Sequence, residues 1–305
     1  MTLYRQNGNI TYPARRDHPE LRSFGLATRY FPCYINRKKS LHKVETVLLS
    51  FIIRGKAIHY LGENEIKESG PSLSITHFGQ FHSIITPREG IEIMNIFFDP
   101  QVYPLPQLGA PLDKILNLFL PIHPGFQNEL NKIVHIDLKG DDTAVEVVKL
   151  LNREFEQKLP GYINTAEALF RLFLIILCRK VLKSGFDFKG LPQIKLSSVA
   201  EKARVYIEDN FREKFSLIKV ADLVALSPNY LCREFKKHTG KTIFKYLTEK
   251  RLQMAMQMLR FTNDKIISIA YESGFSDISF FNRKFKLYTG MSPADYRKKF
   301  REYQY

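Results

Sequence analysis

The chain has 305 residues, of which 44% are hydrophobic, enough for two domains that each have a core. No apolar run reaches the roughly 20 residues that a membrane-spanning helix needs, and the polar N-terminus predicts no signal peptide. Three cysteines show neither disulfide-like nor metal-like spacing. These features argue against a membrane protein or a disulfide scaffold and predict a cytoplasmic location.

Positive charge is in excess and unevenly placed. The chain carries 46 Lys and Arg against 31 Asp and Glu, a net charge of +15. Residues 195–305 hold 22 basic and 12 acidic residues, whereas residues 1–194 hold 24 and 19. A basic C-terminal third suits a polyanion, because neutralising phosphates releases counterions. Charge alone is equally compatible with a generally basic soluble protein.

The first 140 residues read as a β domain. Residues 1–24 are polar with two prolines, and we expect an irregular or partly ordered arm there. Short β-branched or aromatic runs follow, separated by Gly and Pro, and this pattern predicts a barrel or jelly roll. The expected strands are 27–35, 44–53, 57–61, 72–76, 83–86 and 92–98.

Helical periodicity begins after a proline-rich stretch, 100–125, in which we expect one short helix at 113–120. Apolar residues at helical spacing predict helices at 143–158 and from Asn164 or Thr165 to Lys183. The segment 170–178 is apolar on more than one face. It fits a helix packed on its own barrel, a homodimer seam, or both. Residues 185–196 contain Gly and Pro and read as a linker between domains.

The C-terminal third reads as helices joined by tight turns. Ser198, with Glu201 three residues later, predicts a capping box for a helix that ends near Asn210. A short helix at 221–226 and a basic helix capped by Ser227 and ended by Gly240 follow. A connecting helix at 242–260 would span ~28 Å. That length is close to the ~34 Å of one DNA turn, which separates successive major grooves.

The same pattern then repeats. Ile266, Ile269 and Ala270 share one face of a short helix, and Gly274 suits a left-handed turn. The next helix, capped by Ser276 or Asp277, turns Phe281 and Phe285 inward and ends at Gly290. A third helix begins at Ser292-Pro293. Ala221 and Leu226 correspond to Ala270 and Phe275, 49 residues later. Five further pairs lie 50 residues apart: Leu231/Phe281, Arg233/Arg283, Phe235/Phe285, Thr239/Thr289 and Gly240/Gly290. Such self-similarity is a stronger signal than either copy alone.

These two units resemble the tandem helix-turn-helix of the AraC/XylS family of bacterial transcription regulators. The second unit carries the pattern Ile-Ala-x-x-x-Gly-Phe-Ser-Asp-x-Ser-x-Phe-x-Arg-x-Phe-Lys-x-x-x-Gly-x-Ser-Pro-x-x-Tyr-Arg over 269–297. The resemblance covers roughly 196–300; a looser one, in glycine spacing and His82, links the N-terminal part to the cupin-like sensing domain of that family.

The resemblance implies an α+β multidomain fold. Its parts would be a cupin-like ligand-sensing β domain at 1–140, a helical pair and dimerisation candidate at 141–184, the linker, and a tandem helix-turn-helix DNA-binding domain at 197–305. The implied function is a ligand-responsive, sequence-specific transcription activator. Its partners would be double-stranded promoter DNA, a small-molecule effector such as a sugar or related carbon source, a second copy in a homodimer, and RNA polymerase.

Candidate DNA contacts lie on the exposed faces of the two basic helices. Arg pairs with guanine and Asn with adenine through two hydrogen bonds, and the matching positions of the family read bases. The expected base-reading residues are Asn229, Cys232, Arg233, Ser279, Asn282 and Arg283. Further along, Lys236, Lys237 and Lys286 are placed to meet phosphates. Each lysine is also compatible with a solvated helix face.

Candidate effector contacts are polar residues of the β domain, since a small barrel can hold one small ligand in its mouth. We expect them among Arg29, Tyr34, Arg54, Tyr60, His77 and His82. The histidines, scattered over the domain, lack metal-site spacing, so we expect neither a metal nor another cofactor.

Two alternatives remain: a cupin-type metal enzyme, or a ligand-free dimerisation barrel, fused to a DNA-binding module. No phosphate loop, nucleophile elbow or zinc-protease helix is present in the sequence, so we expect no enzymatic activity.

Overall fold

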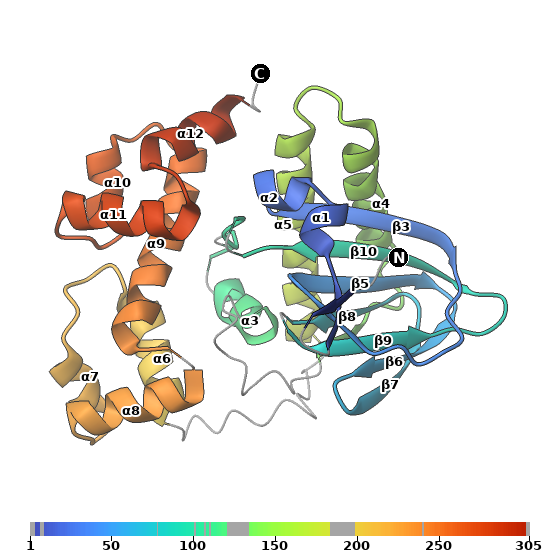
Figure 1. The fold of residues 1–305 in the computed structure, drawn as a ribbon, viewed down its shortest axis with the longest axis horizontal. Coiled ribbons are helices and arrows are strands. Elements are labelled where there is room, and N and C mark those ends of the chain that lie inside the picture. The colour runs from blue at the N-terminus through green and yellow to red at the C-terminus, as the bar shows by residue number, and fades with distance from the viewer. Residues whose placement is uncertain are drawn as a thin grey trace. The chain divides into compact units, whose positions relative to one another are not determined.

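A computed structural model describes residues 4–6, 9–77, 79–100, 102–106, 108–109, 111–120, 134–183, 199–239 and 241–302. The described residues form two compact units, one up to residue 183 and one from residue 199, and each is described by itself (Figure 1). The expected capping box at Ser198, the linker at 185–196 and the helix end at Gly240 lie outside the described residues.

The N-terminal unit is built from two sheets. The first, in the order β1-β2-β4-β9-β6-β7, has six strands, and the second, in the order β11-β8-β5-β10-β3, has five. The strands of the first sheet are β1 (Tyr4–Gln6), β2 (Asn9–Tyr12), β4 (His42–Val44), β9 (Phe81–Ile85), β6 (Lys56–Leu61) and β7 (Asn64–Ser69). Those of the second are β11 (Val134–Asp137), β8 (Ser72–Thr76), β5 (Val47–Arg54), β10 (Ile91–Phe98) and β3 (Leu26–Tyr34).

The described part of the N-terminal arm is ordered: β2 pairs in parallel with β4, and two short helices, α1 (Ala14–Asp17) and α2 (Glu20–Ser23), follow. Two other expectations for this unit need correction. The single strand expected at 44–53 is two strands, β4 and β5, which join different sheets. Strands β7 and β11 were not expected, because β7 is largely polar and β11 has four residues. Strand β11 pairs with β8, which lies far away in sequence, whereas β7 pairs with the preceding strand, β6, in a hairpin.

Two long helices pack on the outer face of the five-stranded sheet (Figure 1). They are α4 (Asp142–Gln157) and α5 (Tyr162–Lys183), and a shorter helix, α3 (Leu112–Phe119), precedes them. The ring centroids of Phe51 on β5 and Phe173 on α5 are 5.9 Å apart, and those of Phe98 on β10 and Phe170 are 5.8 Å apart. Helix α5 begins two residues before the expected cap at Asn164.

The helical pair is therefore held against its own sheet. Six side chains of the apolar segment expected as a packing face or a dimer seam are buried within the unit: Phe170, Phe173, Leu174, Ile176, Leu177 and Cys178. Leu172 of the same segment is 40% exposed. Burial of this extent accounts for most of the apolar character of the segment without a partner chain.

The C-terminal unit contains only helices in its described residues. The first half holds α6 (Val199–Asn210), α7 (Leu217–Leu223) and α8 (Pro228–Thr239). Helix α9 (Ile243–Phe261) joins it to the second half, which holds α10 (Ile266–Glu272), α11 (Ile278–Thr289) and α12 (Pro293–Glu302). Helix α7 begins four residues before the expected start at 221, because Ser216 caps it by accepting a hydrogen bond from the Lys219 amide.

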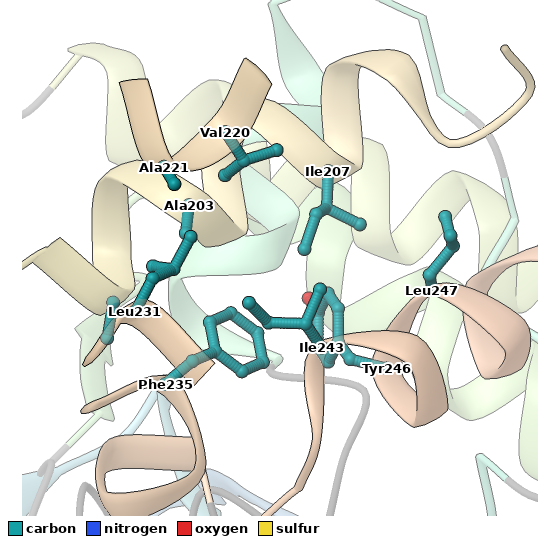
Figure 2. Close-up of a cluster of buried hydrophobic side chains, with 10 residues drawn as sticks. Ala203, Ile207, Val220, Ala221, Leu231, Phe235, Ile243, Tyr246 and Leu247 are labelled. Atoms are coloured by element: carbon teal, nitrogen blue, oxygen red, sulfur yellow. The ribbon is translucent and has the colours of Figure 1, made fainter. Parts of the chain in front are cut away.

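Figure 2 shows the apolar core of the first half, where side chains from four helices meet. Leu231 and Phe235 of α8 point into it, as their helical spacing predicts. The residues labelled there are buried: Ala203, Ile207, Val220, Ala221, Leu231, Phe235, Ile243, Tyr246 and Leu247. In the second half Phe281 and Phe285 occupy the positions equivalent to Leu231 and Phe235 and are also fully buried.

Candidate functional site

Helices α8 and α11 are capped in the same way. The Ser227 hydroxyl accepts a hydrogen bond from the Tyr230 amide at 3.3 Å, and the Asp277 carboxylate accepts one from the Phe280 amide at 2.5 Å. A capping side chain satisfies one of the amides that a helix leaves unpaired at its N-terminus. Both helices therefore begin at a fixed residue, and this sets which side chains face outward.

The C-terminal ends of the two helices are also alike. The Thr239 hydroxyl lies 2.6 Å from the Phe235 carbonyl oxygen and accepts a hydrogen bond from the Lys241 amide at 3.2 Å. The Thr289 hydroxyl lies 2.8 Å from the Phe285 carbonyl oxygen and accepts one from the Met291 amide at 3.3 Å. The duplication inferred from the sequence thus extends to individual hydrogen bonds.

The faces opposite the core carry the expected DNA-contacting residues. Eight of the nine side chains are exposed: Asn229, Arg233, Lys236, Lys237, Ser279, Asn282, Arg283 and Lys286. Cys232 differs, since it is half-buried against the apolar core. Its position leaves it less able to reach a base edge than its neighbour Arg233.

Each of the two arginines lies over an aromatic ring three residues earlier. The Arg233 guanidinium carbon is 4.9 Å from the centroid of the Tyr230 ring, and that of Arg283 is 5.5 Å from the centroid of the Phe280 ring. Cation–π contact at such distances is attractive, and residues at i and i+3 share a helix face. These rings were not among the expected contacts, although their 50-residue separation matches that of the arginines.

The two halves of the unit are in close contact at the turn after α10. Gly274 has φ +95°, and a Cβ there would lie 2.7 Å from the Phe211 carbonyl oxygen and 2.8 Å from Arg251 Nε. Arg251, on α9, donates to the carbonyl oxygens of Phe211 at 2.7 Å and of Glu213 at 2.8 Å. This close approach fixes how the second half packs against the loop that follows α6.

A buried charge cluster fixes α6 against α9. Glu208 lies 2.8 Å from Arg204 and 3.3 Å from Lys250, and it accepts a hydrogen bond from the Tyr246 hydroxyl. Burial alone raises the pKa of the Glu208 carboxyl, but Lys250 and Arg204 outweigh burial, so that its pKa is lowered. The carboxylate stays ionised, and it holds α6 against α9.

The N-terminal unit contains a cavity between its two sheets. Its polar lining consists of Tyr12, Arg29, Tyr34, His42, Ser50, His82 and Asn95, and its apolar lining of Phe31, Leu48, Ile84, Ile93 and Phe97. Its volume is about 30 Å³, room for a few water molecules at most. A ligand the size of a monosaccharide requires lining side chains to move.

One wall of this cavity is a polar row across the five-stranded sheet. Asn95 on β10 is paired with Arg29 on β3 and with Ser50 on β5. Ser50 is paired with Ser74 on β8, and Ser74 with His135 on β11. Directly paired residues of a sheet point to the same face, so all five side chains face the first sheet. The neighbours of Ser50 on this face, Leu48 and Ile52, are apolar and buried.

Arg29, Tyr34 and His82 of the expected effector contacts line the cavity, and the other three do not. The Arg54 side chain is 84% exposed and lies 3.8 Å from Glu92. The Tyr60 ring is covered by the Lys39 ammonium at 3.8 Å, and His77 is buried away from the lining. Residue type alone indicated Arg54 and Tyr60, and residue type carries no information on which side of its strand a side chain occupies.

Four polar lining residues were missed: Tyr12, His42, Ser50 and Asn95. Ser50 carried a usable signal, because it is a lone hydroxyl within the apolar run Val47–Ile53. Tyr12 and Asn95 carried none, since their placement depends on pairing between distant strands.

Among the described residues no group of three or more His, Cys, Asp or Glu side chains is arranged to hold a metal ion. None of the described helices combines the length and apolar character needed to cross a bilayer.

Comparison with known proteins bears on both units. A family model described as a helix-turn-helix domain matches residues 220–299. The HTH-type transcriptional activator RhaR of Shigella dysenteriae serotype 1 is 25% identical over 266 residues, which cover 87% of this chain and 89% of RhaR. The C-terminal domain of AraT, a response regulator from Geobacillus stearothermophilus, is 33% identical over 34% of this chain and 87% of that domain, with a TM-score of 0.33.

A transcriptional regulator of Chromobacterium violaceum with an AraC-type DNA-binding domain is 30% identical, covering 33% of this chain and 90% of that one, with a TM-score of 0.31. Since its relatives are transcription regulators both along most of its length and across the duplicated helix-turn-helix, the chain belongs to the AraC/XylS family of DNA-binding transcription regulators.

Proposed function

We propose that α8 and α11 enter successive major grooves and read bases through Asn229, Arg233, Asn282 and Arg283, with Cys232 and Ser279 close to the bases. The observation that carries this proposal is the repeated exposed arginine, stacked on an aromatic ring at the same place in both helices. Guanidinium groups pair with the O6 and N7 atoms of guanine, and the stacking restricts their rotation. Lys236, Lys237 and Lys286, further along the same faces, hold the phosphates.

We also propose that a small-molecule effector binds the cavity of the N-terminal unit and changes DNA affinity. Support comes from the polar row inside an otherwise apolar sheet face, because polar groups left in a core without partners are costly unless a ligand or water satisfies them. Ser50 Oγ and Asn95 Oδ1 are buried and have no hydrogen-bond partner among the residues that the structure describes. An effector acts only if it binds one domain arrangement more tightly than another.

A third proposal concerns the direction of regulation and the protein partners. RhaR is named as a transcriptional activator, and we infer that this chain likewise activates, which requires contact with RNA polymerase. It would act in the cytoplasm, where bacterial DNA lies.

We also propose that the chain forms a homodimer through α4 and α5. These helices carry three exposed leucine side chains: Leu150 is 41% exposed, Leu172 40% and Leu182 49%. Light scattering at several concentrations would show a constant monomer mass if this last proposal is wrong.

Selection of bound sequences from a random DNA pool tests the DNA proposal. The full chain should enrich a motif with two conserved patches about 10 base pairs apart, one for each recognition helix. A variant with both Arg233→Ala and Arg283→Ala should enrich a motif that has lost a guanine preference in each patch. Lys202→Ala, which removes an exposed charge from α6, is the matched control and should leave the motif unchanged. A single patch, or a motif unaltered in the double variant, contradicts the proposal.

A further inference from the structure

An exposed aromatic residue stands in the first turn of each recognition helix. Tyr230 is the third residue of α8, and Phe280 is the third residue of α11. The two residues are 41% and 36% exposed, and they lie 50 positions apart, as the arginines do. The N-terminal part of a recognition helix is the part that contacts base edges. Both rings therefore belong to the segment that enters the groove.

The apolar core does not account for these rings. The residues that follow them, Leu231 and Phe281, take the inward positions and are fully buried, and Figure 2 shows Leu231 pointing into the core. Phe280 meets only the edge of the core, where its ring centroid is 6.2 Å from that of Phe275. One exposed ring is ordinary on a protein surface, but the same ring at the same place in two copies indicates a shared role.

Each ring is stacked on the guanidinium of the base-reading arginine. The Arg233 guanidinium carbon lies 4.9 Å from the centroid of the Tyr230 ring. The corresponding distance between Arg283 and Phe280 is 5.5 Å. A guanidinium that pairs with O6 and N7 of a guanine lies in the plane of that base. Because successive base pairs are about 3.4 Å apart, a ring stacked on this guanidinium faces the edge of the neighbouring base pair.

The chemistry of the ring selects the base that it faces. In the major groove thymine presents its C5-methyl group, whereas the other bases present hydrogen-bond donors or acceptors. Phe280 can neither donate nor accept a hydrogen bond, so covering a polar base edge would remove water from it without replacing the lost hydrogen bond. Packing on a methyl group carries no such cost. Tyr230 presents the same ring, with its hydroxyl at the far end.

From this geometry we propose that Tyr230 and Phe280 determine specificity for thymine. Each packs on the C5-methyl group of a thymine in the base pair next to the guanine that the stacked arginine reads. The inference rests on the base reading proposed above for α8 and α11 and adds a base to the sequence that each helix recognises. The methyl contact should matter more for α8, because Cys232 is half-buried whereas its counterpart in α11, Asn282, is exposed and can hydrogen-bond a base.

Deoxyuridine tests the contact on the unaltered chain, because it differs from thymidine only in lacking the methyl group. In the motif that the full chain selects, each thymine is replaced in turn, and fluorescence anisotropy measures affinity. Replacement beside the guanine of either patch should weaken binding about fourfold, the effect of one methyl group removed from water. Replacement elsewhere should change affinity less than twofold. Equal affinity for thymine and uracil beside both guanines overturns the proposal.

Variants assign the contact to its ring. Phe280→Ala should abolish the distinction between thymine and uracil in the patch of α11 only, and Tyr230→Ala in the patch of α8 only. Tyr230→Phe keeps the ring and should retain the distinction. Tyr271→Ala is the matched control, since it removes a 53% exposed ring from α10, outside the recognition helices. Loss of arginine stacking alone would lower affinity for both DNAs equally, so a distinction that persists in both alanine variants overturns the assignment.

Failure here and failure of the proposed base reading are distinguishable. A chain that selects a guanine in each patch and loses that preference in the arginine variants, yet binds uracil as it binds thymine, keeps the proposed function and loses this inference. A motif with no thymine beside either guanine has the same meaning. A chain that selects no motif loses both.

Discussion

At the scale of single residues, arginine and lysine on the recognition helices are expected to act differently. Arg233→Ala or Arg283→Ala should cost about 1–3 kcal/mol on a specific site, because a bidentate contact to one base is lost. Preference should relax at one base position while affinity for random DNA changes little. Fluorescence anisotropy with the selected motif and its single-base variants measures both quantities.

Lysine substitutions provide the contrast. Lys236→Ala or Lys286→Ala should weaken binding to all sequences by a similar factor and reduce the slope of log affinity against log salt by about 1, as one fewer counterion is released. Base-specific loss in a lysine variant, or uniform loss in an arginine variant, would show that the assignments are interchanged.

The cysteines differ in reactivity for a reason visible at the same scale. Burial, with a smaller effect from Asp113, raises the pKa of the Cys178 thiol to about 12, and only the thiolate is nucleophilic. Cys33 is exposed. At pH 8 iodoacetamide should therefore modify Cys33 in the folded chain and reach Cys178 only in denaturant. Peptide mass spectrometry reports each site, and modification of Cys178 in the folded chain would disprove its burial.

At the scale of elements, the turns inside the two helix-turn-helix units form a matched pair. Gly274 and Ala225 occupy equivalent places, with φ +95° and +54°. A left-handed residue with a Cβ costs roughly 1–2 kcal/mol. Gly274→Ala pays this cost and also places a Cβ 2.7 Å from the Phe211 carbonyl oxygen, so it should destabilise the C-terminal unit by more than about 2 kcal/mol.

Ala225→Gly is the opposite experiment. It removes the cost of the left-handed conformation and adds about 0.4–1 kcal/mol of unfolded-state entropy, so its effect should lie between neutral and mildly stabilising. Urea unfolding of the full chain, followed by far-ultraviolet circular dichroism, measures both variants. Equal destabilisation by the two substitutions would contradict the role assigned to the Gly274 contact.

At the scale of the whole molecule, the two units should respond differently to acid. Four histidines of the N-terminal unit have a pKa below the ordinary value of 6.5, and burial is the main cause in each: His18, His42, His82 and His135. The unfolded chain therefore binds protons first as the pH falls. The stability these neutral rings contribute is complete above pH 6.5 and is lost progressively below it.

Calorimetry of the full chain should show this as a transition of the N-terminal unit that moves down by several degrees between pH 7.5 and 5.5, since about 1 kcal/mol corresponds to about 2–4 °C at this size. The transition of the helical unit should move less, because none of the described histidines with a lowered pKa lies in it. His82→Gln should reduce the shift of the N-terminal unit, and an unchanged shift would remove His82 from this explanation.

The sequence by itself determined the DNA-binding half of this protein. Caps at Ser227 and Asp277, the turn at Gly274 and the inward pairs Leu231/Phe235 and Phe281/Phe285 depend on residues a few positions apart. Local spacing decides helices and their faces. The exposed positions of Arg233 and Arg283 could be predicted from this spacing. The start of α7 could not, because the local sequence does not show that Ser216, and not a later residue, caps the helix.

Only the tertiary structure decided the cavity. The row Arg29–Asn95–Ser50 joins strands that are tens of residues apart, as does the pairing of His42 on β4 with His82 on β9, and register sets both alignments. A shift of one residue in any strand would turn its side chain to the other face. Sequence periodicity says which residues of one strand share a face, but only pairing between distant strands says which residues of two strands meet. That is the physical reason why His82 was expected and His42, Ser50 and Asn95 were not.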